Sequence, residues 1–222
     1  MSQPLPIVVL ASGRGSTFNA LLEAQQRGEL PVDIRALISD RRTAPALGIA
    51  ERNGIPAVAL RSRDHADRLS FDRALFARAA AFEPRLIVLA GYMRIIANEV
   101  VAAWRGRLIN LHPSLLPKYP GLDTYARALA AGDATFGASV HYVTGELDGG
   151  PVIAQVELPI ASQDTAETLA ARLRPAEQAL LVAVVRLIAG ERVALAGDAV
   201  QLDRAILRAP LRLAAGGGLT GL

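Results

Sequence analysis

Short apolar runs alternate with amphipathic segments through the first half of the chain. Runs rich in Val, Ile and Leu are typical of strands buried on both faces, and they fall at 7–11, 34–39, 57–60 and 86–91. Segments with apolar residues at helical spacing follow at 18–26, 44–53 and 68–82. The alternation predicts an α/β fold with a doubly wound, mostly parallel sheet flanked by helices, a Rossmann-like arrangement.

The pattern changes in the second half of the chain. After a helix expected at 123–131, two strands are expected at 138–143 and 152–158. Their connection is too short for a crossover, so we expect an antiparallel C-terminal part of the fold. A long helix is expected at 165–188, and Pro175 should kink or break it.

Neither an internal repeat nor a linker divides the sequence. We therefore expect a single domain over residues 1–205, which ends in a small hairpin at 193–202. Residues 206–222 become rich in glycine toward the end, and we expect them to form a flexible C-terminal tail.

The composition narrows the classes of function. Hydrophobic residues make up 51% of the chain, as in a folded protein. The net charge is +3 and the arginines are dispersed, so we expect no nucleic-acid partner. The absence of cysteine excludes disulfides and thiol nucleophiles. Residues 1–11 do not resemble a signal peptide and the apolar run at 179–185 cannot span a bilayer, so we expect a cytoplasmic protein with no membrane partner.

A glycine-rich turn at 12–17 joins the first expected strand to the first helix. This layout points backbone N–H groups and the positive end of a helix at an anion, and the hydroxyls of Ser16 and Thr17 can donate to phosphate oxygens. The turn lacks the lysine of a nucleotide P-loop and does not complete a dinucleotide fingerprint. The alternative is an ordinary tight turn with a Ser/Thr cap.

The segment 110–121 carries the main candidates for catalysis. Asn110 and His112 stand two residues apart at an expected strand end, and three prolines stiffen the loop that follows. Asp148 lies in a second turn-rich loop. A carboxylate beside an imidazole favours the imidazolium, and an amide can donate to an oxygen that becomes negative. The alternative is that Asn110 and His112 only cap the loop.

Other kinds of chemistry have less support in the sequence. We expect His65, in a polar loop, to be solvated, and His141, within a strand, to be a structural hydrogen-bonded residue. No serine stands in a nucleophile-elbow pattern, so covalent catalysis is not expected. Three scattered histidines without spaced carboxylates do not predict a metal site. Asparagine, histidine and aspartate together suit an acyl-type transfer in which the substrate supplies the nucleophile.

Five segments carry a family resemblance that extends from about residue 7 to about residue 202: VVLASGRGST, LIVLAGYMRII, GRLINLHPSLLPKYPGLDT, SVHYVTGELDGGPVIAQ and RPAEQ. They resemble the phosphoribosylglycinamide formyltransferases, also called glycinamide ribonucleotide transformylases. The HPSLLP element is shared by a wider group of formyltetrahydrofolate-using enzymes. The segments KYPGLDT and ELDGGPVIAQ have a narrower distribution and favour the glycinamide ribonucleotide enzymes.

The resemblance implies transfer of the formyl group of the co-substrate 10-formyltetrahydrofolate to the amine of glycinamide ribonucleotide, in de novo purine biosynthesis. The amine would attack directly, through a tetrahedral intermediate and without a metal. His112 would be the general acid, and Asn110 would hydrogen-bond the formyl oxygen. Asp148 would raise the pKa of His112 and take part in proton transfer through water.

The resemblance also implies binding residues and partners. Gly15, Ser16 and Thr17 would hold the ribose phosphate, and Glu177 would reach the ribose hydroxyls. The folate pocket would be lined by Arg68, Met93, Arg94, Ile95, Ile96, Val143, Thr144 and Asp148. The partners would be the two small-molecule substrates, and the protein would be a monomer or a homodimer.

The sequence departs from the family pattern in places. The family commonly has GNGSN where this chain has GRGST, so Arg14 and Thr17 replace the two asparagines of the common pattern. Asp123 and Tyr125 stand where some relatives carry histidines.

Three alternative functions are less favoured by the sequence. A formyltetrahydrofolate hydrolase would add an N-terminal regulatory domain, and a methionyl-tRNA formyltransferase would add a C-terminal tRNA-binding domain. The first expected strand begins at Ile7 and the chain ends in a short glycine-rich segment, so we expect neither. A non-catalytic nucleotide- or folate-binding module is not expected either, because Asn110, His112 and Asp148 are all present.

Overall fold

The computed structural model describes residues 3–214 and 216–221, and it divides into two compact units, Met1–Asn110 and Leu111–Leu222. The boundary falls within a single strand, β5 (Leu108–His112). The expectation of one domain over residues 1–205 stays a prediction.

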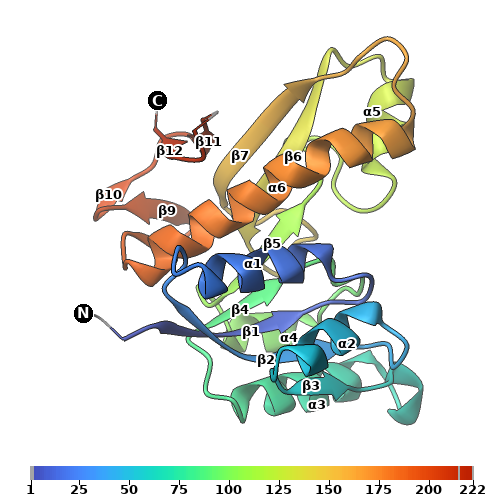
Figure 1. The fold of residues 1–222 in the computed structure, drawn as a ribbon, viewed down its shortest axis with the longest axis vertical. Coiled ribbons are helices and arrows are strands. Elements are labelled where there is room, and N and C mark those ends of the chain that lie inside the picture. The colour runs from blue at the N-terminus through green and yellow to red at the C-terminus, as the bar shows by residue number, and fades with distance from the viewer. Residues whose placement is uncertain (1–2, 215, 222) are drawn as a thin grey trace. The chain divides into compact units, whose positions relative to one another are not determined.

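The first unit is a parallel sheet whose strands alternate with helices (Figure 1). The strand order is β3–β2–β1–β4–β5, and each neighbouring pair is parallel. This order reverses between β1 and β4, which confirms the predicted doubly wound sheet. The strands before β5 are β1 (Leu5–Leu10), β2 (Val32–Ser39), β3 (Ala57–Ala59) and β4 (Leu86–Leu89).

The helices of the first unit form where the apolar residues recur at helical spacing. Phe18 and Leu21 of α1 are fully buried, and α3 begins with a capping box in which Asp67 accepts the Ser70 N–H at 2.7 Å. The helices are α1 (Ser16–Gln26), α2 (Pro45–Arg52), α3 (Arg68–Ala80) and α4 (Asn98–Ala103), with a short 3-10 turn, η1 (Ser62–Asp64). The sequence did not predict α4, because six residues give too little periodicity.

The second unit contains the antiparallel part that the sequence predicted. Strands β6 (Thr135–Tyr142) and β7 (Val152–Pro159) pair antiparallel, and β11 (Leu211–Leu213) adds to β7 in parallel. A separate antiparallel sheet contains β8 (Val193–Ala196), β9 (Ala199–Leu202) and β10 (Ala205–Ile206). The predicted small hairpin near residues 193–202 is therefore confirmed.

Two helices belong to the second unit, α5 (Thr124–Ala130) and α6 (Ala166–Ala189). Figure 1 shows α6 as one continuous helix along β6 and β7, and it is not broken at Pro175. Its buried leucines, among them Leu173 and Leu180 on either side of the proline, hold the helix to the sheet. Packing therefore offsets the backbone hydrogen bond that a proline removes.

The expected C-terminal tail contains structure of its own. In addition to β11, residues Leu219–Thr220 form β12, which pairs antiparallel with β11. Leu211 is buried, so part of the segment after residue 206 packs onto the second unit. The flexibility of this tail stays a prediction. Among the residues that the structure describes, no helix is both long enough and apolar enough to cross a membrane.

Candidate active site

The His112 side chain is buried at the end of β5, and backbone contacts fix its protonation pattern. Its Nε2 lies 2.9 Å from the carbonyl oxygen of Tyr119. A carbonyl can only accept a hydrogen bond, so Nε2 must carry a proton. Nδ1 lies 3.5 Å from Oδ2 of Asp148. Nδ1 is therefore the ring nitrogen that can gain and lose a proton.

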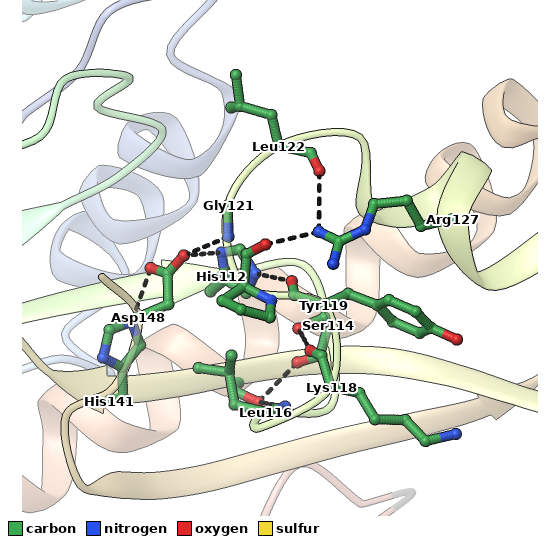
Figure 2. Close-up of polar contacts among 12 residues, drawn as sticks. His112, Ser114, Leu116, Lys118, Tyr119, Gly121, Leu122, Arg127, His141 and Asp148 are labelled. Carbon is green, nitrogen blue, oxygen red and sulfur yellow. Dashed lines mark hydrogen bonds and ion pairs between the residues drawn. The ribbon is translucent and has the colours of Figure 1, made fainter. Parts of the chain in front are cut away.

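Figure 2 shows Asp148 between two imidazoles, those of His112 and His141. Oδ2 accepts the backbone N–H of Gly121 at 2.8 Å, and Oδ1 lies 3.6 Å from Nε2 of His141. Asp148 itself adopts a left-handed backbone conformation, with φ of 51°. The structure therefore brings His112 and Asp148 together, as the sequence predicted.

His141 also belongs to this cluster, and its place within a strand did not predict that position. Its Nδ1 lies 2.9 Å from the carbonyl oxygen of Tyr142, which confirms the expected structural hydrogen bond. The ring also faces Asp148. The signal in the sequence that could have placed His141 near Asp148 was the short connection after β6. This connection carries Asp148 and returns the chain toward the end of that strand.

The electrostatics of the cluster keep Asp148 ionised. Burial raises the pKa of this carboxyl, but the close His141 ring nitrogen, the hydrogen bond from the N–H of Gly121 and the charges of both imidazoles outweigh burial and leave the pKa below its ordinary value. An ionised carboxylate is therefore in place to stabilise a positive charge on His112.

The pKa of His112 is lowered overall, and its largest cause is burial. The Tyr119 carbonyl and the Asp148 carboxylate raise the pKa, while His141 and Arg127 lower it further. Asp148 thus acts in the predicted direction, but burial outweighs it. His112 is a stronger acid than an exposed histidine, and a proton placed on Nδ1 is easily given up.

Asn110 is the third residue of β5, where it pairs in register with Leu89 of β4. Side chains two residues apart on a strand leave the same face, so Asn110 and His112 share a face of β5. Asn110 is half-buried.

The glycine turn lies at the carboxyl end of β1, where the strand order of the first unit reverses. Such positions are the usual ligand sites of open α/β sheets. Gly15 has φ of 80° and precedes α1, whose first turn has no side-chain cap. Ser16 is exposed and Thr17 is half-buried. The N–H groups of this helix end are therefore suited to an anion.

Replacing Gly15 with alanine is expected to destabilise the turn. A Cβ at this position would lie 2.7 Å from Cβ of Ala46 and 2.8 Å from its Cα, and φ is positive. We expect a loss of about 1–3 kcal/mol in the free energy of unfolding, measured by chemical denaturation. Gly13→Ala is the matched control, because nothing lies within 4 Å of its Cβ position. Equal stability of the two variants would contradict this account.

The loop after β4 carries Met93, Arg94, Ile95 and Ile96 and is tied to the glycine turn by Ser12. The buried Ser12 hydroxyl oxygen accepts the Met93 N–H at 2.9 Å. Met93 and Ile95 are exposed, at 60% and 55%, whereas Ile96 is buried. Ser12 opens the glycine turn, but nothing in the sequence pattern predicts its contact with the loop after β4.

Arg94 and Arg68 both lie in the first unit. The Arg94 guanidinium lies over the Phe71 ring, 4.9 Å from its centroid, and Nη1 donates to Ser62 Oγ at 3.3 Å. His65 is half-buried and meets the same ring edge-on at 5.4 Å, so its side chain is only partly solvated. Arg68 is exposed at the first position of α3.

The remaining predicted site residues lie in the second unit. Val143 and Thr144 are half-buried just after β6. Glu177 is half-buried on α6, and burial raises its pKa to about 7, against the opposing effect of Arg174. Within residues 3–214 and 216–221, no group of three or more His, Asp or Glu side chains could hold a metal ion.

Comparisons with known proteins give a consistent match. The family described as "Formyl transferase" matches residues 5–185. The phosphoribosylglycinamide formyltransferase of Escherichia coli (strain K12) is 40% identical over 197 residues, which cover 89% of this chain and 93% of that protein. The solved structure of phosphoribosylglycinamide formyltransferase from Coxiella burnetii superposes with a TM-score of 0.88 and 43% identity, covering 97% of this chain and 98% of that one.

A formyltetrahydrofolate deformylase from Pseudomonas syringae has a similar fold but is more distant. Its TM-score is 0.83 at 26% identity, and the match covers 90% of this chain and 66% of that one. About a third of the deformylase therefore has no counterpart in the match.

Proposed function

The chain belongs to the formyl transferase family, and from this premise we propose that it is a phosphoribosylglycinamide formyltransferase. It transfers the formyl group of 10-formyltetrahydrofolate to the amine of glycinamide ribonucleotide, a step of de novo purine biosynthesis. The observation that carries the chemistry is the His112 imidazole, held between the Tyr119 carbonyl and the Asp148 carboxylate.

The proposed reaction begins when the amine nitrogen of the ribonucleotide attacks the formyl carbon. The carbonyl oxygen becomes negative in the tetrahedral intermediate, and the Asn110 amide donates a hydrogen bond to it. The new C–N bond forms before the bond between the carbon and the folate nitrogen breaks. No covalent intermediate with the protein is needed.

Two proton movements complete the proposed reaction. His112, protonated at Nδ1, gives its proton to the departing folate nitrogen. The attacking nitrogen loses a proton, which returns to Nδ1 through water held at Asp148. Protons gained and lost are therefore balanced over one turnover. Tyr119 keeps the ring fixed throughout, because Nε2 retains its proton.

The proposed binding residues follow the chemistry of each substrate part. The N–H groups and hydroxyls of Gly15, Ser16 and Thr17 hold the phosphate, and the Glu177 carboxylate accepts hydrogen bonds from the ribose hydroxyls. We expect the folate to contact the apolar side chains of Met93, Ile95, Ile96 and Val143, the cationic side chains of Arg68 and Arg94, and the polar side chains of Thr144 and Asp148. Cytoplasmic location, a monomeric or homodimeric state and the absence of a nucleic-acid partner stay predictions.

The function is tested by incubating the purified protein with 10-formyltetrahydrofolate and glycinamide ribonucleotide. We expect a formylated ribonucleotide and tetrahydrofolate in equal amounts, detected by mass spectrometry and absorbance. Release of formate without formylated product would identify a hydrolase instead. Binding of both compounds without turnover would identify a non-catalytic module.

Glu177 is expected to make nucleotide binding depend on pH. With its pKa raised to about 7, this carboxyl is mostly protonated at pH 6 in the free protein. Ribose hydroxyls donate to the ionised form, so binding at pH 6 should release a proton and affinity should rise from pH 6 to pH 8. Calorimetry in buffers of different ionisation enthalpy measures this release.

The matched variant for this prediction is Glu177→Gln, which keeps an acceptor but cannot titrate. We expect it to bind the ribonucleotide without this proton release and with a flatter pH dependence. If wild type and Glu177→Gln release the same number of protons at pH 6, Glu177 is not the titrating contact.

A further inference from the structure

We propose that Gln155 is a positioning residue for the active site. It anchors the loop between His112 and Gly121, and through this loop it orients the His112 imidazole and the Asp148 carboxylate. The inference rests on the proposed function of those two residues, but its geometry lies entirely within the second unit.

Gln155 is a buried polar residue in the middle of β7, only 4% exposed. It pairs in register with Ser139 of β6. Its Nε2 donates to the carbonyl oxygen of Leu116 at 2.9 Å and to Oγ of Ser139 at 3.0 Å. Both protons of the amide nitrogen are therefore used, one on the loop and one on the neighbouring strand.

Ser139 is fully buried and completes the anchor. Its hydroxyl donates to the carbonyl oxygen of Ser114 at 2.6 Å and accepts the N–H of Leu116 at 3.1 Å. With Gln155 as the second donor, the hydroxyl has one proton given and two hydrogen bonds accepted, which is its full capacity. Two strand residues thus fix the loop at positions 114 and 116.

The anchored loop ends at the site itself, as Figure 2 shows. The Ser114 hydroxyl donates to the carbonyl oxygen of Lys118 at 2.6 Å. The next residue, Tyr119, supplies the carbonyl that binds His112, and Gly121 supplies the N–H that binds Asp148 at 2.8 Å. Hydrogen bonds and a few backbone residues therefore connect Gln155 to the His112 imidazole and to the Asp148 carboxylate.

The chemistry of the anchor requires an amide. A carboxylate at position 155 would place a charged acceptor against the Leu116 carbonyl, and an apolar side chain would leave that carbonyl and Ser139 with unmet hydrogen bonds. Either change would loosen the loop, and a shift of about 1 Å at reacting groups can cost about 100-fold in rate.

The test compares Gln155→Met with Val156→Ala. Met keeps the length of the side chain but donates no hydrogen bond. Val156, also buried on β7, forms no side-chain hydrogen bond and serves as the control for a weakened strand. We expect Gln155→Met to lower kcat about 10- to 100-fold, with KM for the ribonucleotide within about twofold of the wild-type value. Val156→Ala should keep kcat within about threefold of the wild-type value, at a melting temperature similar to that of Gln155→Met.

A second readout does not depend on turnover. The Nε2 proton of His112 is held by the Tyr119 carbonyl, so nitrogen-15 NMR of the ring should show a slowly exchanging proton in wild type and Val156→Ala. We expect fast exchange in Gln155→Met. If the ring proton of Gln155→Met exchanges as slowly as in wild type and kcat is unchanged, the proposal is overturned. Altered exchange in a protein without formyl transfer would support the anchor while removing the proposed function.

Discussion

Replacing His112 with alanine is expected to lower kcat by roughly 10²- to 10⁴-fold, with little change in affinity for the ribonucleotide. The side chain is buried, and its Nδ1 faces Asp148 while Nε2 is fixed on Tyr119. His141 cannot take over, because it lies on the far side of the carboxylate from His112 (Figure 2). Rapid-quench or steady-state formyl transfer measures kcat, and calorimetry measures binding.

Two further variants make this result specific. His112→Gln retains a polar side chain that can donate to the Tyr119 carbonyl but cannot transfer a proton, so it should lose as much activity as His112→Ala. His65→Ala removes an imidazole in the first unit and should keep kcat near the wild-type value. A near-normal kcat for His112→Gln would remove His112 from the role of general acid.

The sheet of the first unit could be predicted because its signal is local. Strand β4, for example, is a continuous apolar run, and every residue of β4 is buried. The turn after β1 and the loop after β4 then had to meet at one edge, since parallel strands share their carboxyl end. The structure adds the hydrogen bond from Met93 to Ser12 that joins them, which depends on side-chain direction and cannot be read from spacing.

The active site could be predicted only in part, because only some of its features are local in the sequence. Asn110 and His112 were visible because they interrupt an apolar strand. The net pKa of His112 depends on its burial, the role of His141 depends on the return of the loop after β6, and the anchor at Gln155 depends on the register of β6 with β7. Each of these is set by contacts between segments that lie far apart in sequence.

Replacing Asp148 with asparagine is expected to lower kcat about 10- to 100-fold and to change its pH dependence. Asparagine keeps an oxygen that can accept the Gly121 N–H, and it tolerates the positive φ of this position. The negative charge is lost, and with it a contribution that raises the pKa of His112. Burial then acts with less opposition, so the pKa of His112 falls further.

The sign of the change follows from the form of His112 that is active. The general acid must carry a proton on Nδ1, so kcat falls as pH rises through the pKa of His112. A lower pKa moves this limb of the kcat profile to lower pH in Asp148→Asn. Asp123→Asn is the matched control, since Asp123 also has a positive φ but is exposed. If the Asp148→Asn profile overlays the wild-type profile after scaling, the carboxylate does not support the charge on His112, and its role is confined to holding Gly121.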